Sequence, residues 1–406
     1  MEQYIKEQAT SMLRYAVPSL VASVFRKHTS PEIFESKRKA GGFIKGICHP
    51  NENFAQIKGA GIRWNREDLP FPFNADGSVS QNWLNCKAKI KRYVDAGIKI
   101  MAVTPYPREY IEAGLDPRLP ENEARVREAA VFMIKDLKGL VSAFQITNEM
   151  GVPRFINPLT MEEAVRFIGI HLAAMHPYRG DILIGYNSAG PQANLHVPMK
   201  AYHKYCDYIG IDIYIGCFAP ATNWFIEFGL LLRYLYGLTG KPIILTEFGY
   251  ISGGAPKTKE EKTAVLQRYG VSSEKEARED IQTFVSKLNT RMQDQVKNNA
   301  SGDWGDFLFQ LDFCNHLYSE LPKHTVIPRF PHTPEGQAGF YAAIFKYFAK
   351  FPYLIGTFVY CYQDSRECYV CGQSDCPTET RWGIVDMDGR EKPSYYALRD
   401  AWKNIK

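Results

Sequence analysis

Residues 141–149 read Val-Ser-Ala-Phe-Gln-Ile-Thr-Asn-Glu, and residues 242–249 read Pro-Ile-Ile-Leu-Thr-Glu-Phe-Gly. Each stretch is a short, largely apolar run that leads into a polar residue. Runs of about four to eight such residues are typical of strands buried on both faces of a parallel sheet. The two stretches therefore indicate two parallel strands, each with a glutamate at or just past its carboxyl end.

Six further runs of the same kind lie along the chain, at Phe43 to Cys48, Gly61 to Arg66, Ile98 to Val103, Ile182 to Tyr186, Tyr208 to Tyr214 and Leu354 to Cys361. Helical patterns lie between most of the runs, at Asn82 to Ala96, Glu121 to Leu137, Met161 to Met175 and Gly336 to Phe351. Together with Val141 to Thr147 and Pro242 to Thr246, the chain has eight strands alternating with helices. This order predicts an α/β fold, a (β/α)8 TIM barrel.

The barrel is expected to occupy residues 41–406, after a helical N-terminal extension at residues 1–40. Residues 251–335 separate the seventh strand from its helix and are predicted to be an insertion. Material inserted after a barrel strand lies on the catalytic face, so we expect a lid or a wall of the binding site, with a peripheral decoration as the alternative. The insertion contains a charged helical pattern at 273–298 and a loop rich in aromatic residues and histidine at 304–332.

The composition is that of an ordinary globular protein, with 45% hydrophobic and 23% charged residues among 406, which excludes a disordered or fibrous chain. The net charge of +5 is spread over the sequence without a long run of one sign. We therefore expect neither a nucleic-acid partner nor a membrane partner. The apolar run Ala16 to Phe25 is too short to span a bilayer and indicates a packed terminal helix, with an export signal as the alternative.

Nine cysteines, an odd number, occur in this large chain. They favour reduced thiols in the cytoplasm over a disulfide framework, although secretion stays open. Cys368-Tyr-Val-Cys371 and the nearby Cys376 have the tight spacing of a zinc site. The sequence offers no obvious fourth ligand. Whether these three cysteines bind a structural metal, or are free or bridged thiols, therefore stays open.

Two carboxylates at strand ends suggest a specific chemistry. Cleavage of a glycosidic bond with retention needs one carboxyl group to protonate the leaving oxygen and a second, about 5 to 5.5 Å away, to attack the anomeric carbon. A single glutamate at a strand end is more often a helix cap or a surface charge. Glu149 after the fourth strand and Glu247 after the seventh predict such a pair in one barrel.

Asn148-Glu149 and Thr246-Glu247-Phe248-Gly249 resemble the strand ends of the clan A glycoside hydrolases. That clan contains retaining enzymes on (β/α)8 barrels, including cellulase-like, β-xylosidase-like and β-galactosidase-like families. Residues 61–66 and 210–214 are similar to the second and sixth strands of the clan, and the run from Trp382 is similar to its closing hairpin. The resemblance covers nearly the whole chain except the extension and the insertion.

The resemblance implies that Glu149 is the acid/base and Glu247 the nucleophile, and that no cofactor or catalytic metal is needed. It also implies that Asn148 binds the sugar 2-hydroxyl and that Arg66 and Tyr214 hold Glu247 ionised and oriented. The chemistry agrees, because a neighbouring cation lowers the pKa of a carboxyl group and poor solvation raises it.

The chain departs from the clan at two positions. Met150 stands where a proline often follows the acid/base, and Tyr360 stands where a tryptophan usually lies beneath the sugar. The second difference leaves the sugar preference open. We expect Tyr360, together with His49, Trp64 and Trp382, to contact the substrate.

The sequence thus predicts a retaining β-glycosidase that acts on oligosaccharides or small β-glycosides. The alternatives are a barrel that binds carbohydrate without hydrolysing it and an endo-acting β-glycanase of the same clan. A barrel with metal-dependent chemistry would need His and Asp ligands at several strand ends, and only His49 qualifies. The sugar, the linkage and the oligomeric state stay open.

Overall fold

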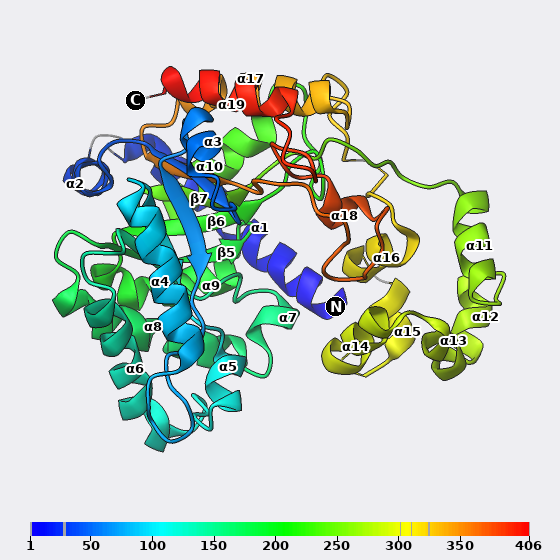
Figure 1. Ribbon diagram of the computed structural model, residues 1–406, viewed down its shortest axis with the longest axis horizontal. Coiled ribbons are helices and arrows are strands. Elements are labelled where there is room, and N and C mark those ends of the chain that lie inside the picture. The colour runs from blue at the N-terminus through cyan, green and yellow to red at the C-terminus, as the bar shows by residue number, and fades with distance from the viewer. Residues whose placement is uncertain (1, 27–29, 301, 310, 324, 406) are drawn as a thin grey trace.

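The computed structural model describes residues 2–26, 30–300, 302–309, 311–323 and 325–405. Its strands form a closed, all-parallel barrel in which neighbours follow chain order and the last strand pairs with the first (Figure 1). They are β1 (Ile44–Cys48), β2 (Trp64–Asp68), β3 (Lys99–Val103), β4 (Ala143–Ile146), β5 (Leu183–Ala189), β6 (Tyr208–Ile213), β7 (Ile243–Phe248) and β8 (Leu354–Val359). The predicted (β/α)8 barrel is confirmed.

The outer helices are α3 (Phe54–Gly59), α4 (Gln81–Asp95), α5 (Pro107–Glu112), α6 (Glu123–Asp136), α8 (Met161–Met175), α9 (Ala193–Met199), α10 (Ile226–Thr239), α17 (Pro334–Phe348) and α19 (Pro393–Lys403). The short helices α7 (Pro153–Ile156) and α18 (Pro377–Thr380) follow β4 and β8. Helix α8 has the predicted bounds because a capping box fixes its start. The Thr160 hydroxyl accepts from the Glu163 amide, and the Glu163 carboxylate accepts from the Thr160 amide.

The second strand differs from the predicted run at both ends. Gly61 has a φ of 81°, which is outside the extended region, so the strand begins at Trp64. It then continues past Arg66 to Asp68. As a result Trp64 lies at the start of the strand and Arg66 lies in its middle.

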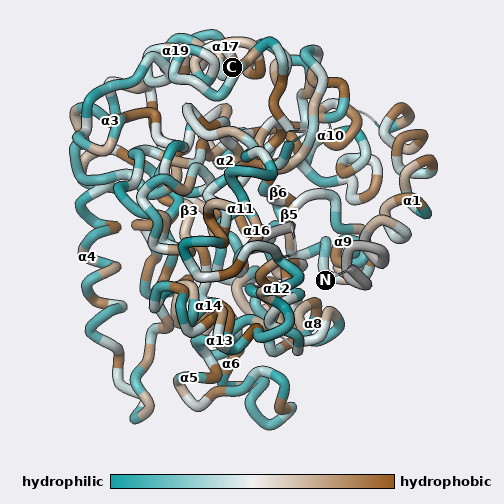
Figure 2. Tube along the Cα trace, turned by 90° about the vertical axis from the view of Figure 1, so that its right-hand side faces the viewer, coloured by the Kyte–Doolittle hydropathy of each residue, from teal (hydrophilic) through white to brown (hydrophobic). Residues whose placement is uncertain are grey.

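Two helices, α1 (Glu2–Phe25) and α2 (Pro31–Ala40), precede the barrel. Helix α1 packs closely on α10, because a Cβ on Gly237 would stand 1.7 Å from the carbonyl oxygen of Ser19. Helix α1 lies on the outside of the molecule (Figure 2). Its side chains Leu13 and Val17 are exposed. Residues 1 and 27–29 of the expected extension lie outside the described residues. Within the described parts, none of the helices combines the length and apolarity needed to cross a bilayer.

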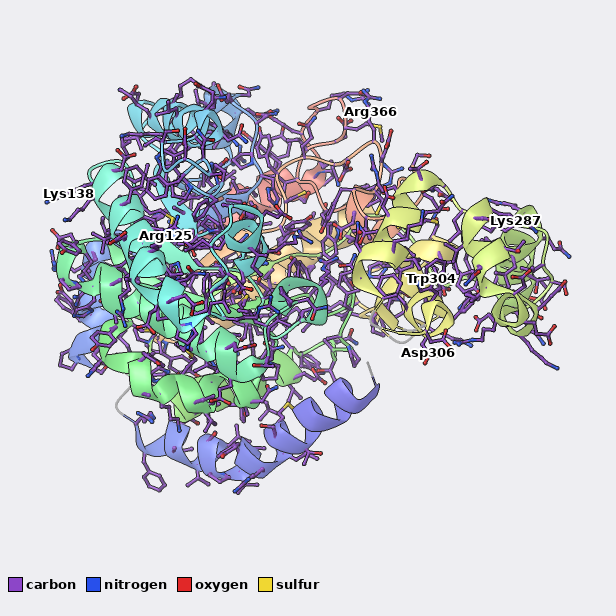
Figure 3. All side chains as sticks on the ribbon, turned by 90° about the horizontal axis from the view of Figure 1, so that it is seen from below. Arg125, Lys138, Lys287, Trp304, Asp306 and Arg366 are labelled. Carbon is purple, nitrogen blue, oxygen red and sulfur yellow. The ribbon has the colours of Figure 1, made fainter. Side chains whose placement is uncertain are left out.

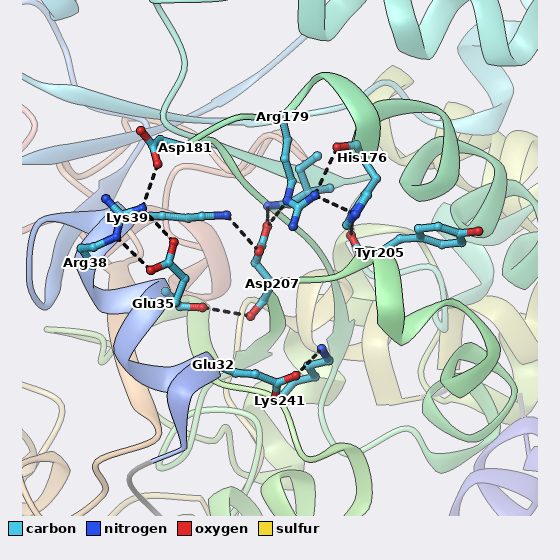
Figure 4. A network of polar contacts seen from close by, with 12 residues as sticks. Glu32, Glu35, Arg38, Lys39, His176, Arg179, Asp181, Tyr205, Asp207 and Lys241 are labelled. Carbon is cyan, nitrogen blue, oxygen red and sulfur yellow. Dashed lines mark hydrogen bonds and ion pairs between the residues drawn. The ribbon is translucent and has the colours of Figure 1, made fainter.

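Helix α2 covers the N-terminal end of the barrel through a polar network (Figure 4). Lys39 lies 3.2 Å from the carboxylate of Asp207, which Arg179 also approaches at 3.4 Å. Lys241 pairs with Glu32 at 3.3 Å. Asp207 directly precedes β6, and Lys241 lies two residues before β7. These contacts therefore close the barrel at the end where its strands begin.

In the parts of this segment that the structure describes, six helices lie between β7 and α17: α11 (Lys259–Arg268), α12 (Glu274–Glu279), α13 (Ile281–Lys287), α14 (Thr290–Asn299), α15 (Trp304–Phe309) and α16 (Leu311–Tyr318). They project from one side of the barrel, with Lys287, Trp304 and Asp306 on the projecting part (Figure 3). Their apolar side chains form a second hydrophobic cluster beside the barrel core, with Val265, Phe284, Val296 and Leu317 among its buried members.

This segment differs from the sequence expectation in two respects. The charged pattern at 273–298 forms three short helices instead of one, because Asp280 and Asn289 each accept a backbone N–H and start a new helix. The stretch at 304–332, expected as a loop, begins with α15 and α16. Their apolar residues pack into the second cluster, which favours helix over loop.

Candidate active site

Glu247 lies near the end of β7 and is held by two donors. An Nη1 of Arg66, from β2, donates to its Oε1 at 2.7 Å, and the hydroxyl of Tyr214, directly after β6, donates to its Oε2. Arg66 and Glu247 are only 3% and 9% exposed. A carboxylate that accepts from a cation on one oxygen and from a hydroxyl on the other is fixed in direction.

The remaining donors of Arg66 reach the end of β4. Its Nε donates to Oε1 of Gln145 at 3.1 Å, and its Nη2 donates to Oδ1 of Asn148 at 2.6 Å. The buried guanidinium is thus satisfied by one carboxylate and two amide oxygens. Gln145 was missed by the sequence analysis, although a polar residue inside the apolar strand Ala143–Ile146 was a usable signal.

Three donors fix the amide of Asn148. Its Oδ1 accepts from Arg66, from Gln145 at 3.0 Å and from Asn187 at 2.7 Å. Since the oxygen faces these donors, the amide nitrogen points the other way and can donate to a ligand. Arg66 also links the two strand ends that carry the predicted carboxylates, because it donates to Glu247 and to Asn148, the neighbour of Glu149.

Glu149 directly follows Asn148 and takes a left-handed backbone conformation, with a φ of 47°. Its N–H donates to Oδ1 of Asn187 at 2.9 Å. Thr147 and His49, at the ends of β4 and β1, also have positive φ values, 54° and 51°. Side-chain-bearing residues adopt this region at a cost, and such strain gathers where the surrounding contacts hold a functional loop in place.

A third carboxylate, Asp212, pairs in register with Glu247 across β6 and β7. It accepts from Asn187 at 2.7 Å and from the Thr246 hydroxyl at 2.6 Å. Burial, followed by the charges of Glu247 and Glu149, raises the pKa of Asp212 well above its usual value. Asp212 was also missed, yet alternation along a strand already placed it on the same face as Tyr214.

An aromatic cluster lies against Tyr214. The ring of Trp382 is 4.9 Å from that of Tyr214 and 5.8 Å from that of Tyr360, which in turn is 5.6 Å from His49. Trp382 is 1% exposed and its indole N–H donates to the carbonyl of Thr378, so it is a fixed, buried contact for Tyr214 and Tyr360. A Cβ on Gly249 would stand 2.2 Å from the Tyr360 carbonyl oxygen, so only glycine fits there.

Glu379, in α18, is a further acidic residue beside this cluster. Its Oε2 accepts from the Tyr360 hydroxyl at 3.0 Å. Burial raises the pKa of Glu379 to about 7, against opposing contributions from His316 and Arg154. Its place in the sequence gives no sign of this contact, because only the folded loop after β8 brings Glu379 to Tyr360.

Of the nine predicted site residues, the structure brings eight together at the carboxyl end of the barrel: Glu149, Glu247, Asn148, Arg66, Tyr214, His49, Tyr360 and Trp382. Trp64 is not among them. It is 2% exposed, and as the first residue of β2 it pairs with Gly46 in the middle of β1 and with Lys99 at the start of β3. Lys99 Nζ lies 5.4 Å from its ring. The late start of β2 explains this position.

A groove of about 700 Å³ lies elsewhere, between residues 223–225 and α17. Neither Glu149 nor Glu247 lines it. Among the described residues, one group of side chains could hold a metal ion, His316 with Cys368, Cys371 and Cys376, and it also excludes both glutamates. The site around Glu149 and Glu247 therefore rests on its own hydrogen-bond network.

No protein-family model and no curated protein matches the sequence. Solved structures share the fold. A family 39 glycoside hydrolase from Bacteroides cellulosilyticus WH2 has a TM-score of 0.56 and 14% identity, over 89% of this chain and 64% of that one. The GH53 catalytic domain of Ignisphaera aggregans has a TM-score of 0.54 and 16% identity, over 90% and 93%.

A GH2 β-galacturonidase from Eisenbergiella tayi has a TM-score of 0.51 and 13% identity, and this chain covers 51% of its length. The chain thus spans less than two thirds of the family 39 and GH2 structures. At these identities the likeness concerns the fold, and the chain has the eight-stranded parallel barrel that these glycoside hydrolases share.

Proposed function

We propose that this protein is a retaining β-glycoside hydrolase, with Glu247 as nucleophile and Glu149 as acid/base. The observation that carries the proposal is the pair of bonds from Arg66, one to Glu247 and one to Asn148. They link the ends of β7 and β4, the two places from which a barrel glycosidase of this kind supplies its carboxylates. The solved structures with the same fold are glycoside hydrolases, which supports the proposal.

In the first step Glu247 attacks the anomeric carbon and Glu149 gives a proton to the leaving oxygen. Arg66 and Tyr214 each donate to one oxygen of Glu247, which fixes the direction of the carboxylate. In the second step Glu149 takes a proton from water, which attacks the glycosyl-enzyme and releases Glu247. The sugar 2-hydroxyl is bound by the amide nitrogen of Asn148, whose oxygen is already occupied by three donors.

The substrates are short β-glycosides or oligosaccharides. Tyr360 and His49 contact the sugar, and the buried Trp382 packs against Tyr360. Residues 251–335, with the loop after β8, border the substrate on one side. Support comes from Gln373 in that loop, which donates to the His316 carbonyl of α16, and from Glu379, which bonds to Tyr360.

A direct assay distinguishes this proposal from its rival, a barrel that binds carbohydrate without hydrolysing it. A panel of nitrophenyl β-glycosides, with digestion of glucan, xylan and mannan, should give turnover by the native chain. The Glu149→Gln and Glu247→Gln variants should both still unfold in one cooperative thermal transition, which should be lower for Glu247→Gln because Arg66 loses its carboxylate partner. Glu247→Gln should lose turnover of every substrate, and Glu149→Gln should lose turnover of glucan, xylan and mannan, whose leaving groups need a proton. Binding of an oligosaccharide by calorimetry, with no product from any substrate, would contradict the proposal.

A further inference from the structure

Four buried side chains outside the barrel site converge on one point. His316 belongs to α16, whereas Cys368, Cys371 and Cys376 belong to the loop between β8 and α18. Their potential ligand atoms all lie within 4.8 Å of one another. The four residues come from two segments that are far apart in sequence, so their meeting is a product of the fold.

The spacing of these atoms fits a tetrahedral metal site. His316 Nδ1 lies 3.4 Å from Cys368 Sγ and 3.5 Å from Cys376 Sγ. With Zn–S bonds of about 2.3 Å and Zn–N bonds of about 2.0 to 2.1 Å, the nitrogen-to-sulfur edge of a tetrahedron is about 3.5 Å. All three cysteines are free thiols.

The surrounding donors suit thiolate ligands. The backbone N–H of Cys371 donates to Cys368 Sγ at 3.4 Å, and the side chain of Gln373 donates to Cys371 Sγ at 3.5 Å. The Thr378 hydroxyl lies 2.8 Å from Cys376 Sγ. Hydrogen bonds to the ligand sulfurs are the usual outer shell of a zinc site, since they stabilise the deprotonated form.

The turn between the first two cysteines is built for this role. The N–H of Gly372 donates to the Cys368 carbonyl at 2.8 Å, and Gly372 has a φ of 74°. The chain therefore reverses directly after Cys371, which brings both thiols to the same side. A Cys-x-x-Cys spacing is among those that structural zinc sites use.

We propose that His316, Cys368, Cys371 and Cys376 bind one Zn²⁺ ion as a closed structural site. Three thiolates and one imidazole are the soft and borderline ligands that favour zinc over magnesium or calcium. Four protein ligands complete the tetrahedron, so no position is left for water or substrate, and the role is structural.

The position of the site explains what the metal stabilises. The second hydrophobic cluster contains Cys368, Cys371 and Cys376 together with residues of α11–α16, and a small core of this kind gains stability from a metal staple. The ion joins α16 to the loop after β8. Cys376 is the N-cap residue of α18, which carries Glu379, so the same ion fixes an acidic residue beside Tyr360.

Metal analysis of the full chain, purified under reducing conditions, tests the proposal. We expect one zinc per chain, and a thermal transition that falls on chelation and returns when Zn²⁺ is added back. Cys371→Ser should reduce the zinc content to less than about a tenth per chain. Cys314→Ser is the matched control, because it removes a thiol from the same helix as His316 without removing a proposed ligand, and it should retain one zinc.

A second variant keeps the test decisive if Cys371→Ser is insoluble. His316→Cys supplies four thiolates and should still bind one metal ion, and Co²⁺ exchange should strengthen the thiolate-to-cobalt absorption relative to the native chain. The absence of metal from the native chain after Zn²⁺ supplementation would overturn the proposal. Full zinc content in Cys371→Ser would also overturn it. So would a disulfide between two of the three cysteines, detected by mass spectrometry in the native chain purified under reducing conditions. None of these outcomes depends on glycosidase activity.

Discussion

Arg66 and Glu247 form a buried ion pair across the barrel, with 2.7 Å between Nη1 and Oε1. They come from β2 and β7, which are separated in the barrel by β1 and β8. The guanidinium therefore reaches over the strand ends to the carboxylate. Because both groups are buried, each compensates a charge that would otherwise be costly to remove from water.

The first prediction concerns that pair. Arg66→Met removes the donor that fixes Oε1 of Glu247, so kcat/KM should fall because the carboxylate is no longer held in direction. Loss of one partner of a buried pair should also lower the free energy of unfolding by about 3–5 kcal/mol. Arg66→Lys, which retains a cation, should lose less activity. Steady-state kinetics and thermal unfolding measure the two effects. Arg63→Met, which removes an exposed guanidinium just before β2, is the control, and an equal loss there would refute the argument.

The second prediction concerns Glu247 as nucleophile. Glu247→Ala should abolish turnover, because no group remains to attack the anomeric carbon. Added azide should restore reaction with an activated aryl β-glycoside and give the α-configured glycosyl azide, since azide enters from the emptied face. The product is identified by NMR. Recovery of only the β-azide would contradict the assignment.

The third prediction concerns Glu149 as acid/base. Glu149→Ala should slow substrates with poor leaving groups by about 10²–10⁴-fold and activated aryl glycosides far less, since only poor leaving groups need a proton. The alkaline limb of the pH profile should disappear as well. Steady-state kinetics over a series of leaving groups measures both effects, and an equal loss for all of them would argue against the role.

The fourth prediction concerns Asp212, whose pKa is raised by burial and by the charges of Glu247 and Glu149. Asn resembles the protonated carboxyl group. In Asp212→Asn the new amide oxygen can accept from Asn187 and the amide nitrogen can donate to Thr246, so the fold should be retained. Asp212→Ala removes the acceptor of the Thr246 hydroxyl and one of the acceptors of the Asn187 amide, so it should be the less stable variant.

The sign of its pH dependence follows from linkage. Because the folded pKa of Asp212 lies above the unfolded value, its stabilising contribution is complete below the unfolded pKa and is lost as pH rises through the folded pKa. Asp212→Asn lacks this loss. Its melting temperature relative to the native chain should therefore increase with pH, and a difference that stays constant or falls with pH would refute the argument.

The local pattern of the sequence determined the strands and the two candidate carboxylates. Short apolar runs such as residues 242–246 have few alternatives to a buried strand, and the residue at the end of a barrel strand lies at its carboxyl face whatever the loops do. For the same reason the strand-end residues Asn148 and Tyr214 could be placed from the sequence. Met161–Met175 could be bounded because its capping box is local.

Only the tertiary structure decided which distant residues meet. The spacing of Cys368, Cys371 and Cys376 is visible in the sequence. His316, in α16, could not be assigned to them, because no local rule relates α16 to the loop after β8. Glu379 was hidden for the same reason. Trp64 could not be placed because its position depends on where β2 begins, and the turn at Gly61 moves that start three residues along the chain. Periodicity is a property of neighbouring residues, whereas contacts between loops depend on the closure of the whole barrel.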